Sequence, residues 1–169
     1  MVITKGTRKM SYRIAALSFA SVLLAAPVLA QTPMRARPPE AFKFIPAKEV
    51  EALTDKPGPG VKTSFPVDHE DYDVEYAQRT DKGNEPEVHT YRTHYIHVLS
   101  GESVLTYGGT VTNSRETSPG QIRGDGISGG TSITVRAGDF LQIPAGMPHL
   151  FEVASPTVKF RYVVFNARQ

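Results

Sequence analysis

The sequence predicts an all-β domain built from many short strands, folded as a sandwich or a barrel, with a short helical or irregular extension before it. From residue 61 onward, short runs of strand-forming residues are separated by tight glycine and proline breaks. Examples are Ser100-Gly101, Gly108-Gly109 and Pro144-Ala145-Gly146. Regular glycine and proline breaks between short strands are typical of sandwiches and barrels. The chain shows no internal repeat.

The strand at 71–78 shows the pattern most clearly. Tyr72, Val74 and Tyr76 fall on one face, whereas the alternate positions from 71 to 75 are all acidic, which predicts a half-buried strand. A Gly/Ser-rich segment at 113–130 predicts a long loop, and loops of that length are usually functional or mobile. Further strands are expected at 86–91, 94–100, 102–107, 131–136, 139–143, 148–154 and 158–165.

The N-terminus has the layout of a secretory signal peptide. Residues 1–13 carry four basic residues and no acid, and an apolar run at 14–29 ends in small residues at Ala30. The run of 16 residues is shorter than the ~20 that a membrane-spanning helix needs, and Pro27 would break a helix near its end. We therefore expect cleavage near Ala30, a periplasmic or secreted protein, and no membrane contact after the signal is removed.

The extension between signal and domain has two parts. Residues 31–41 are Pro-rich and polar, which indicates a flexible linker. Residues 46–54 are expected to form a short helix, because Pro46 is acceptable at a helix start and Val50 and Leu53 share a face. The expected organisation is a signal peptide at 1–30, a linker with a short helix at 31–59, and a β-domain at 60–169.

Charge and cysteine content exclude several functions. The chain has 19 Lys+Arg and 17 Asp+Glu, and the signal peptide accounts for four of the cations, so the mature part has a net charge of −2. It shows no basic stripe, so we expect no nucleic-acid partner. There is no cysteine, which excludes disulfides, cysteine-ligated zinc or iron–sulfur sites, and thiol catalysis.

Two segments resemble the motifs of the cupin family. In the first, from Glu87 to Gly101, His89 stands at the family's second histidine position, Glu87 at the first, and His94 at the position of the family's glutamate. The second, from Gly138 to His149, fits the pattern of Gly, five residues, Pro, one residue, Gly, two residues, His. Val153 stands where the family has an asparagine. The resemblance covers roughly residues 60–165 and implies a double-stranded β-helix, or jelly-roll barrel, that holds a metal and is often dimeric.

The spacing also has a physical reason. Residues i and i+2 of a strand point to the same face, so Glu87 and His89 project together. His94 begins the next strand after a short turn, and His149 follows a Pro-x-Gly turn on a distant strand. A barrel would gather three imidazoles and one carboxylate, a set that suits one divalent ion such as Fe, Mn, Zn or Ni. Glu87 has three alternative roles: fourth ligand, acid that orients an imidazole, or general base.

Other polar residues are candidates for substrate contact. Tyr91 shares strand parity with His89, Tyr107 ends the strand that follows, and Arg123 lies in the long loop, from which it would reach the barrel mouth. The alternative is that the tyrosines belong to the core and the arginine to an exposed loop. His97 has the opposite parity to His94 and should point away from the metal.

Two classes of function remain open. The first is a metal-dependent enzyme of dioxygenase, isomerase or lyase type that acts on a small oxygenated molecule. The second is a non-catalytic binding module for a sugar, a metabolite or the metal itself. A homodimer is implied by the resemblance and by edge strands that would otherwise be exposed.

Overall fold

The computed structural model describes residues 40–56, 60–80, 85–154 and 158–169. The expected signal peptide at 1–30 and most of the linker lie outside the described residues. Residues Phe42–Gln169 form one compact unit. The described residues contain no helix that could span a membrane.

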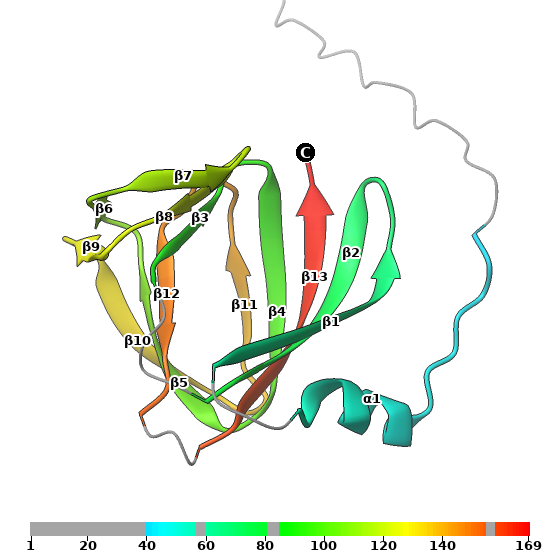
Figure 1. Ribbon diagram of the computed structural model, residues 1–169. Helices are drawn as coiled ribbons and strands as arrows, with labels where there is room; N and C mark the ends of the chain where they lie inside the picture. The colour runs from blue at the N-terminus through cyan, green and yellow to red at the C-terminus, as the bar shows by residue number, and fades with distance from the viewer. Residues whose placement is uncertain (1–39, 57–59, 81–84, 155–157) are drawn as a thin grey trace, which may run out of the picture. The chain divides into compact units, whose positions relative to one another are not determined.

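The unit consists of two antiparallel sheets that face each other (Figure 1). Sheet A has the order β1 (Val61–Asp68), β2 (Tyr72–Arg79), β13 (Phe160–Arg168), β4 (Arg92–Ser100) and β11 (Phe140–Ile143). Sheet B has the order β10 (Thr131–Arg136), β5 (Glu102–Tyr107), β12 (His149–Glu152), β3 (Glu87–His89), β8 (Gln121–Arg123) and β7 (Arg115–Ser118). A small hairpin pairs β6 (Thr110–Thr112) with β9 (Gly126–Ser128).

The eight strands expected at 71–78, 86–91 and onward to 158–165 are confirmed, with ends that differ by up to three residues. The expected helix is also confirmed as α1 (Ala47–Thr54). It lies against β1 and β2. The segment after the helix is fixed by a hydrogen bond in which the Gln78 side chain donates to the Lys56 carbonyl at 2.8 Å.

The hydrophobic core fills one end of the space between the sheets. Inward positions of β4, β12 and β13 supply it, and Phe151, Phe160 and Tyr162 pack with ring centroids 5.1–5.7 Å apart. The same strands continue inward with polar residues at their other ends: His94 on β4 and Asn166 on β13. One end of the barrel is therefore apolar core, and the other is free to hold a polar site.

The structure decides one point that the sequence left open and corrects one expectation. On β2 the polar face is the inward one: Asp73 is 1% exposed, and Arg79 is also buried, whereas Tyr72 and Val74 are only half-buried. The segment 113–130 is not a plain loop, because it contains β7, β8 and β9. β8 pairs with β3 and so becomes part of sheet B.

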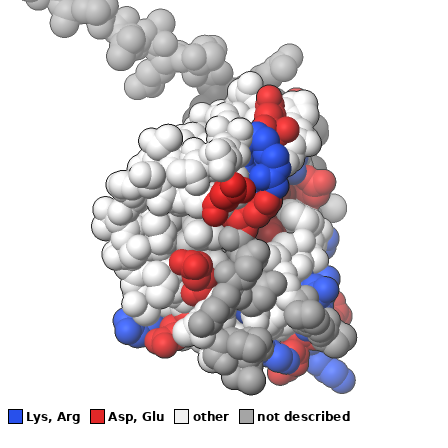
Figure 2. Space-filling view, turned by 60° about the vertical axis from the view of Figure 1, so that its left-hand side comes forward, with Lys and Arg blue, Asp and Glu red and all other residues white. Residues whose placement is uncertain are grey.

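The surface of the unit carries mixed charges. On the face shown in Figure 2, basic and acidic side chains lie next to one another, and the described residues form no continuous basic stripe on that face.

Candidate metal centre

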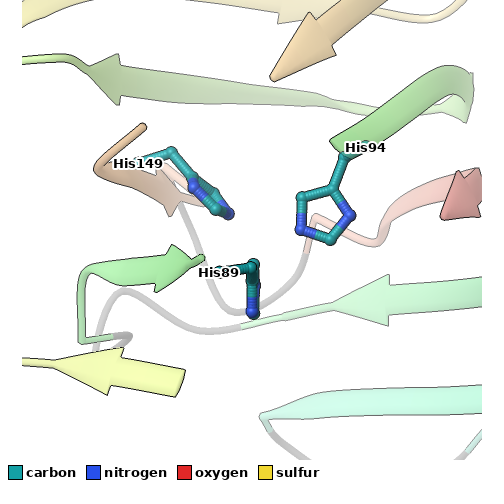
Figure 3. Close-up of side chains that lie close together, drawn as sticks. All are labelled: His89, His94 and His149. Carbon is teal, nitrogen blue, oxygen red and sulfur yellow. The ribbon is translucent and has the colours of Figure 1, made fainter. Parts of the chain in front are cut away.

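Three buried histidines meet at the polar end of the barrel (Figure 3). His94 comes from β4 of sheet A, whereas His89 and His149 come from β3 and β12 of sheet B. One nitrogen of each ring lies within 4.8 Å of the corresponding nitrogens of the other two. The ring centroids are 4.6–5.4 Å apart. The three histidines predicted as metal ligands are therefore brought together.

A turn aligns the strands that carry two of these rings. Gly146 has a φ of +79°, a conformation that favours glycine, and its N–H donates to the His89 carbonyl at 2.9 Å. This contact joins the Pro-x-Gly turn before His149 to the end of β3. The glycine of the second motif thus fixes the spacing between two candidate ligands.

Each imidazole is oriented by an oxygen behind it. The Nδ1 atom of each of the three rings hydrogen-bonds to an oxygen, which fixes the ring orientation, and His89 Nε2 also contacts Glu87 Oε2 at 3.2 Å. For His89 and His94 the partner is the residue directly opposite on the neighbouring strand. The acceptors are Gln121 Oε1 for His89, Asn166 Oδ1 for His94, and the Met147 carbonyl at 3.1 Å for His149.

Glu87 connects the histidines to two arginines. Its Oε2 lies 3.2 Å from His89 Nε2 and 3.7 Å from His149 Nε2. Its Oε1 contacts Arg79 Nη2 at 3.3 Å and Arg123 Nη1 at 2.5 Å. His149, Glu87 and Arg123 are directly opposite one another on three adjacent strands, so the strand register itself places these groups side by side.

The surroundings keep Glu87 ionised. Burial alone raises the pKa of this carboxyl, but the hydrogen bond to His89 and the charges of the arginines outweigh it and hold the pKa well below 4.5. A carboxylate with so low a pKa is a weak proton acceptor. Of the roles expected for Glu87, this environment favours the fourth ligand over the general base.

Two of the histidines, His94 and His149, are held in the neutral form that binds metals. Burial lowers the pKa of His149 to about 4. Burial, together with the neighbouring His149 and His89, lowers the pKa of His94 to about 3. Both rings are therefore neutral at pH 7, and a metal ion has no proton to displace from them.

The histidines open into a cavity of about 210 Å³. Its polar lining includes Glu75, Arg79, Arg92 and Arg123 in addition to the candidate ligands. Burial raises the pKa of Glu75, whose carboxyl lies 3.4 Å from the Asn166 amide nitrogen.

Apolar side chains complete the wall of the cavity. Val61 and Phe65 of β1 line it, and Phe151 and Ile96 contribute from the core. The site is thus a small cavity with both polar and apolar lining.

The three candidate substrate contacts have different positions. Arg123 lines the cavity and contacts Glu87. Tyr91 lies in the turn between β3 and β4, is 64% exposed and is not among the lining residues. Tyr107 packs against the core and lines a separate apolar cavity of about 340 Å³. His97 is exposed, as its strand parity predicts.

Several residues of the site were missed by the sequence analysis, above all Glu75, Arg79, Gln121 and Asn166. The sequence relates the first two only by strand parity, because Glu75 and Arg79 fall on the same face of the alternating strand. Gln121 and Asn166 have no comparable signal, since only the strand pairing identifies them as neighbours of the histidines.

Comparisons with known proteins identify the fold. No protein-family model matches the chain, and no curated protein matches its sequence. A Klebsiella pneumoniae protein with a double-stranded β-helix domain superposes with a TM-score of 0.53 at 19% identity, over 76% of this chain and 91% of its own. The polyketide cyclase RemF of Streptomyces resistomycificus superposes with a TM-score of 0.50 at 19% identity, over 76% of this chain and 81% of its own. The fold expected from the two motifs is confirmed: the chain has the double-stranded β-helix fold of the cupins.

Proposed function

We propose that this protein is a metal-dependent enzyme that binds one divalent ion on His89, His94 and His149. The observation that carries the proposal is the convergence of three buried imidazoles whose Nδ1 atoms each hydrogen-bond to an oxygen behind the ring. Three protein histidines that leave a position open for water or substrate are a common catalytic arrangement. The donor set suits Fe, Mn, Zn or Ni.

Each part of the cavity has a distinct task in this proposal. A divalent ion at the histidines supplies a Lewis acid for substrate oxygens, and iron also gives access to dioxygen chemistry. Glu87 adds a fourth ligand from the side of the arginines. Glu75 is the better proton acceptor, because burial raises its pKa above the ordinary value whereas the pKa of Glu87 is lowered. Val61 and Phe65 limit the access of water.

The substrate class in this proposal is a small oxygenated molecule, and the reaction is of dioxygenase, isomerase or lyase type. A structurally similar protein is a polyketide cyclase, which supports the idea that this barrel serves as an enzyme scaffold. We also propose that residues 1–30 are removed during export, so that the enzyme acts in the periplasm or outside the cell. The basic head and short apolar run at the N-terminus support this location.

The first test is elemental analysis of the protein, produced with export and purified without chelator or metal-affinity tag. We expect about one equivalent of a divalent metal per chain, as one three-histidine site requires. The His149→Ala variant should lose it, whereas His97→Ala, with its ring exposed elsewhere on β4, should keep it. A wild type that neither contains nor takes up metal would contradict the proposal.

The second test is turnover by the metal-loaded protein across catechols, sugar acids and keto acids. An enzyme should convert at least one of these, and Glu75→Gln should slow conversion while the metal content stays the same. Saturable binding of a ligand without turnover would instead support the non-catalytic binding module.

A further inference from the structure

Arg92 stands where a substrate would enter the cavity. It is the first residue of β4 and has the same strand parity as His94, Ile96 and Val98, all of which are buried inside the barrel. Arg92 lines the histidine cavity but is itself only half-buried. Arg92 is therefore part of the cavity wall that solvent also reaches, two residues before a candidate metal ligand.

Arg92 differs from the other arginines near the site in having no partner. Within the described part of the chain, no hydrogen bond or ion pair reaches its side chain. Arg79 and Arg123 share the carboxylate of Glu87. Arg168, directly opposite Arg92 on β13, is bound by Asp68 at 2.5 Å and by Asp73 at 2.8 Å.

The unpaired charge on Arg92 is unfavourable because Arg168, a second cation, lies directly opposite it. Like charges directly opposite each other on neighbouring strands destabilise a sheet. Both carboxylates at this place are taken by Arg168, so the charge on Arg92 has no compensation from the sheet. An anion bound between Arg92 and the histidines would supply it.

The cavity as a whole also favours an anion. Three arginines and two glutamates line it, so cationic side chains outnumber acidic ones. A divalent metal at the histidines would increase this excess. A confined site of one sign concentrates ligands of the opposite charge.

Size and shape narrow the class of anion. The cavity of about 210 Å³ is smaller than the ~300–1,000 Å³ of typical ligand pockets, which indicates a small molecule. A planar guanidinium matches the two oxygens of a carboxylate. Phe65, which is 50% exposed although it lines the cavity, and Val61 offer an apolar surface to the rest of the ligand.

We propose that the ligand of this site is a small monocarboxylate with an apolar body, and that Arg92 binds its carboxylate at the cavity mouth. This inference rests on the proposed function, since it names the substrate class of the same site. It assigns to Arg92 the role of a specificity-determining residue. Neutral analogues of the same shape should be rejected, because they leave the guanidinium unpaired.

The test is isothermal titration of the full, metal-loaded chain with acetate, pyruvate and benzoate, and with the neutral amides acetamide and benzamide. We expect at least one acid to bind at least ten-fold more tightly than the amides. Arg92→Gln should weaken binding of that acid about 10- to 100-fold, the range expected for a charge-assisted hydrogen bond. Arg92→Lys should recover part of the loss. The matched control, Arg136→Gln, removes an exposed arginine that pairs with Glu102 on sheet B and should change nothing.

The outcomes separate this inference from the proposed function. Metal content is measured on the same samples, so loss of acid binding in Arg92→Gln with the metal retained supports the role of Arg92. Three results would overturn it: equal binding of acids and amides, wild-type affinity in Arg92→Gln, or inorganic phosphate binding more tightly than every acid. A chain without metal that still binds acids through Arg92 would contradict the enzyme proposal alone.

Discussion

The two oxygens of Glu87 face different partners, and this division organises the site at the scale of single residues. Oε2 faces the imidazoles of His89 and His149, whereas Oε1 faces the guanidiniums of Arg79 and Arg123. A buried carboxylate is tolerated only when its charge is compensated. The two arginines provide that compensation while leaving the other oxygen free for a metal.

The two arginines should differ in their effect on stability. Arg79 is buried, donates to the Tyr162 hydroxyl at 2.7 Å and lies over the Phe151 ring, whereas the Arg123 side chain is 31% exposed. Arg79→Met should lower the free energy of unfolding by about 3–5 kcal/mol, because it leaves a buried charge without its buried partner. Arg123→Met should lower it by about 1 kcal/mol or less. Urea denaturation of the metal-free proteins measures both, and equal losses would show that burial does not decide the difference.

The histidines make the metal-free protein sensitive to acid. The folded-state pKa values of His94 and His149, about 3 and about 4, lie below the ordinary value of 6.5. As pH falls below 6.5, the unfolded chain takes up protons that the folded chain does not, so stability falls until the folded-state pKa values are reached. The slope is about 1.4 kcal/mol per pH unit for each histidine.

The measurement is urea unfolding of the metal-free protein at pH 7 and at pH 5. The wild type should be less stable at pH 5, and His149→Gln should show a smaller difference. Glu87 acts in a lower window: its lowered pKa contributes stability above 4.5 that is lost as the pH falls further. A wild type whose stability is unchanged between pH 7 and pH 5 would contradict the assignment of neutral, buried histidines.

At the scale of strands, direct cross-strand pairs orient the site. His94, Asn166 and Asp73 lie opposite one another on β4, β13 and β2. His94 Nδ1 donates to the Asn166 side-chain oxygen, and Asn166 Nδ2 donates to Asp73 Oδ1 at 2.5 Å. Through Asn166 on the central strand of sheet A, Asp73 thus helps to fix the orientation of the His94 ring.

Removing the middle of this row should weaken metal binding. Asn166→Ala takes away the acceptor behind His94, and we expect metal affinity to fall about 10- to 100-fold, as is usual for partners that orient ligands. Gln142→Ala is the matched control, because that amide donates to the Tyr95 hydroxyl at 3.3 Å on the exposed face of the same sheet. Competition with a chromogenic chelator measures both affinities. Similar losses in the two variants would assign the effect to general damage to sheet A.

The element scale also shows how far the sequence could predict the site. The fixed offsets of the two motifs identified His89, His94 and His149 before any strand was placed, because glycine and proline turns fix where those strands begin. The alternation on β2 predicted a strand but not which face is inward. In most barrels the apolar face is buried, yet here Asp73 is buried opposite Asn166 at the polar end, and Arg79 is buried where it pairs with Glu87 and Tyr162.

Short strands were the other limit of prediction. β8 has three residues, Gln121 to Arg123, within a Gly/Ser-rich segment that has no strand pattern of its own. It is a strand because it pairs with β3, and that pairing places Gln121 behind His89. Intrinsic propensity cannot reveal a strand that depends on its neighbour.

At the scale of the whole molecule, the outer face of sheet A has the character of an interface. Phe140, Phe165 and Leu99 point outward from adjacent strands and are 67%, 41% and 39% exposed. Large apolar side chains grouped on a surface usually mark a contact site. A homodimer through this face remains our prediction for the assembly of the protein.

Light scattering coupled to size-exclusion chromatography tests the assembly. The wild type should elute at twice the chain mass, and Phe140→Glu should shift it toward the monomer, since it places a charge in an apolar contact. Glu152→Gln, on the outer face of sheet B, should leave the mass unchanged. A monomeric wild type at micromolar concentration would contradict the dimer.

The origin of the candidate ligands has a consequence for the chain as a whole. His94 belongs to one sheet, and His89 and His149 belong to the other. A bound ion would therefore link residues 94 and 149, which are far apart in the sequence. It would also join the two sheets at the end of the barrel opposite the core. The chain contains no cysteine, so it has no disulfide to perform this task. Loss of the ion would then make the barrel less rigid as well as inactive. The free energy of unfolding should increase with the fraction of chains that hold the ion.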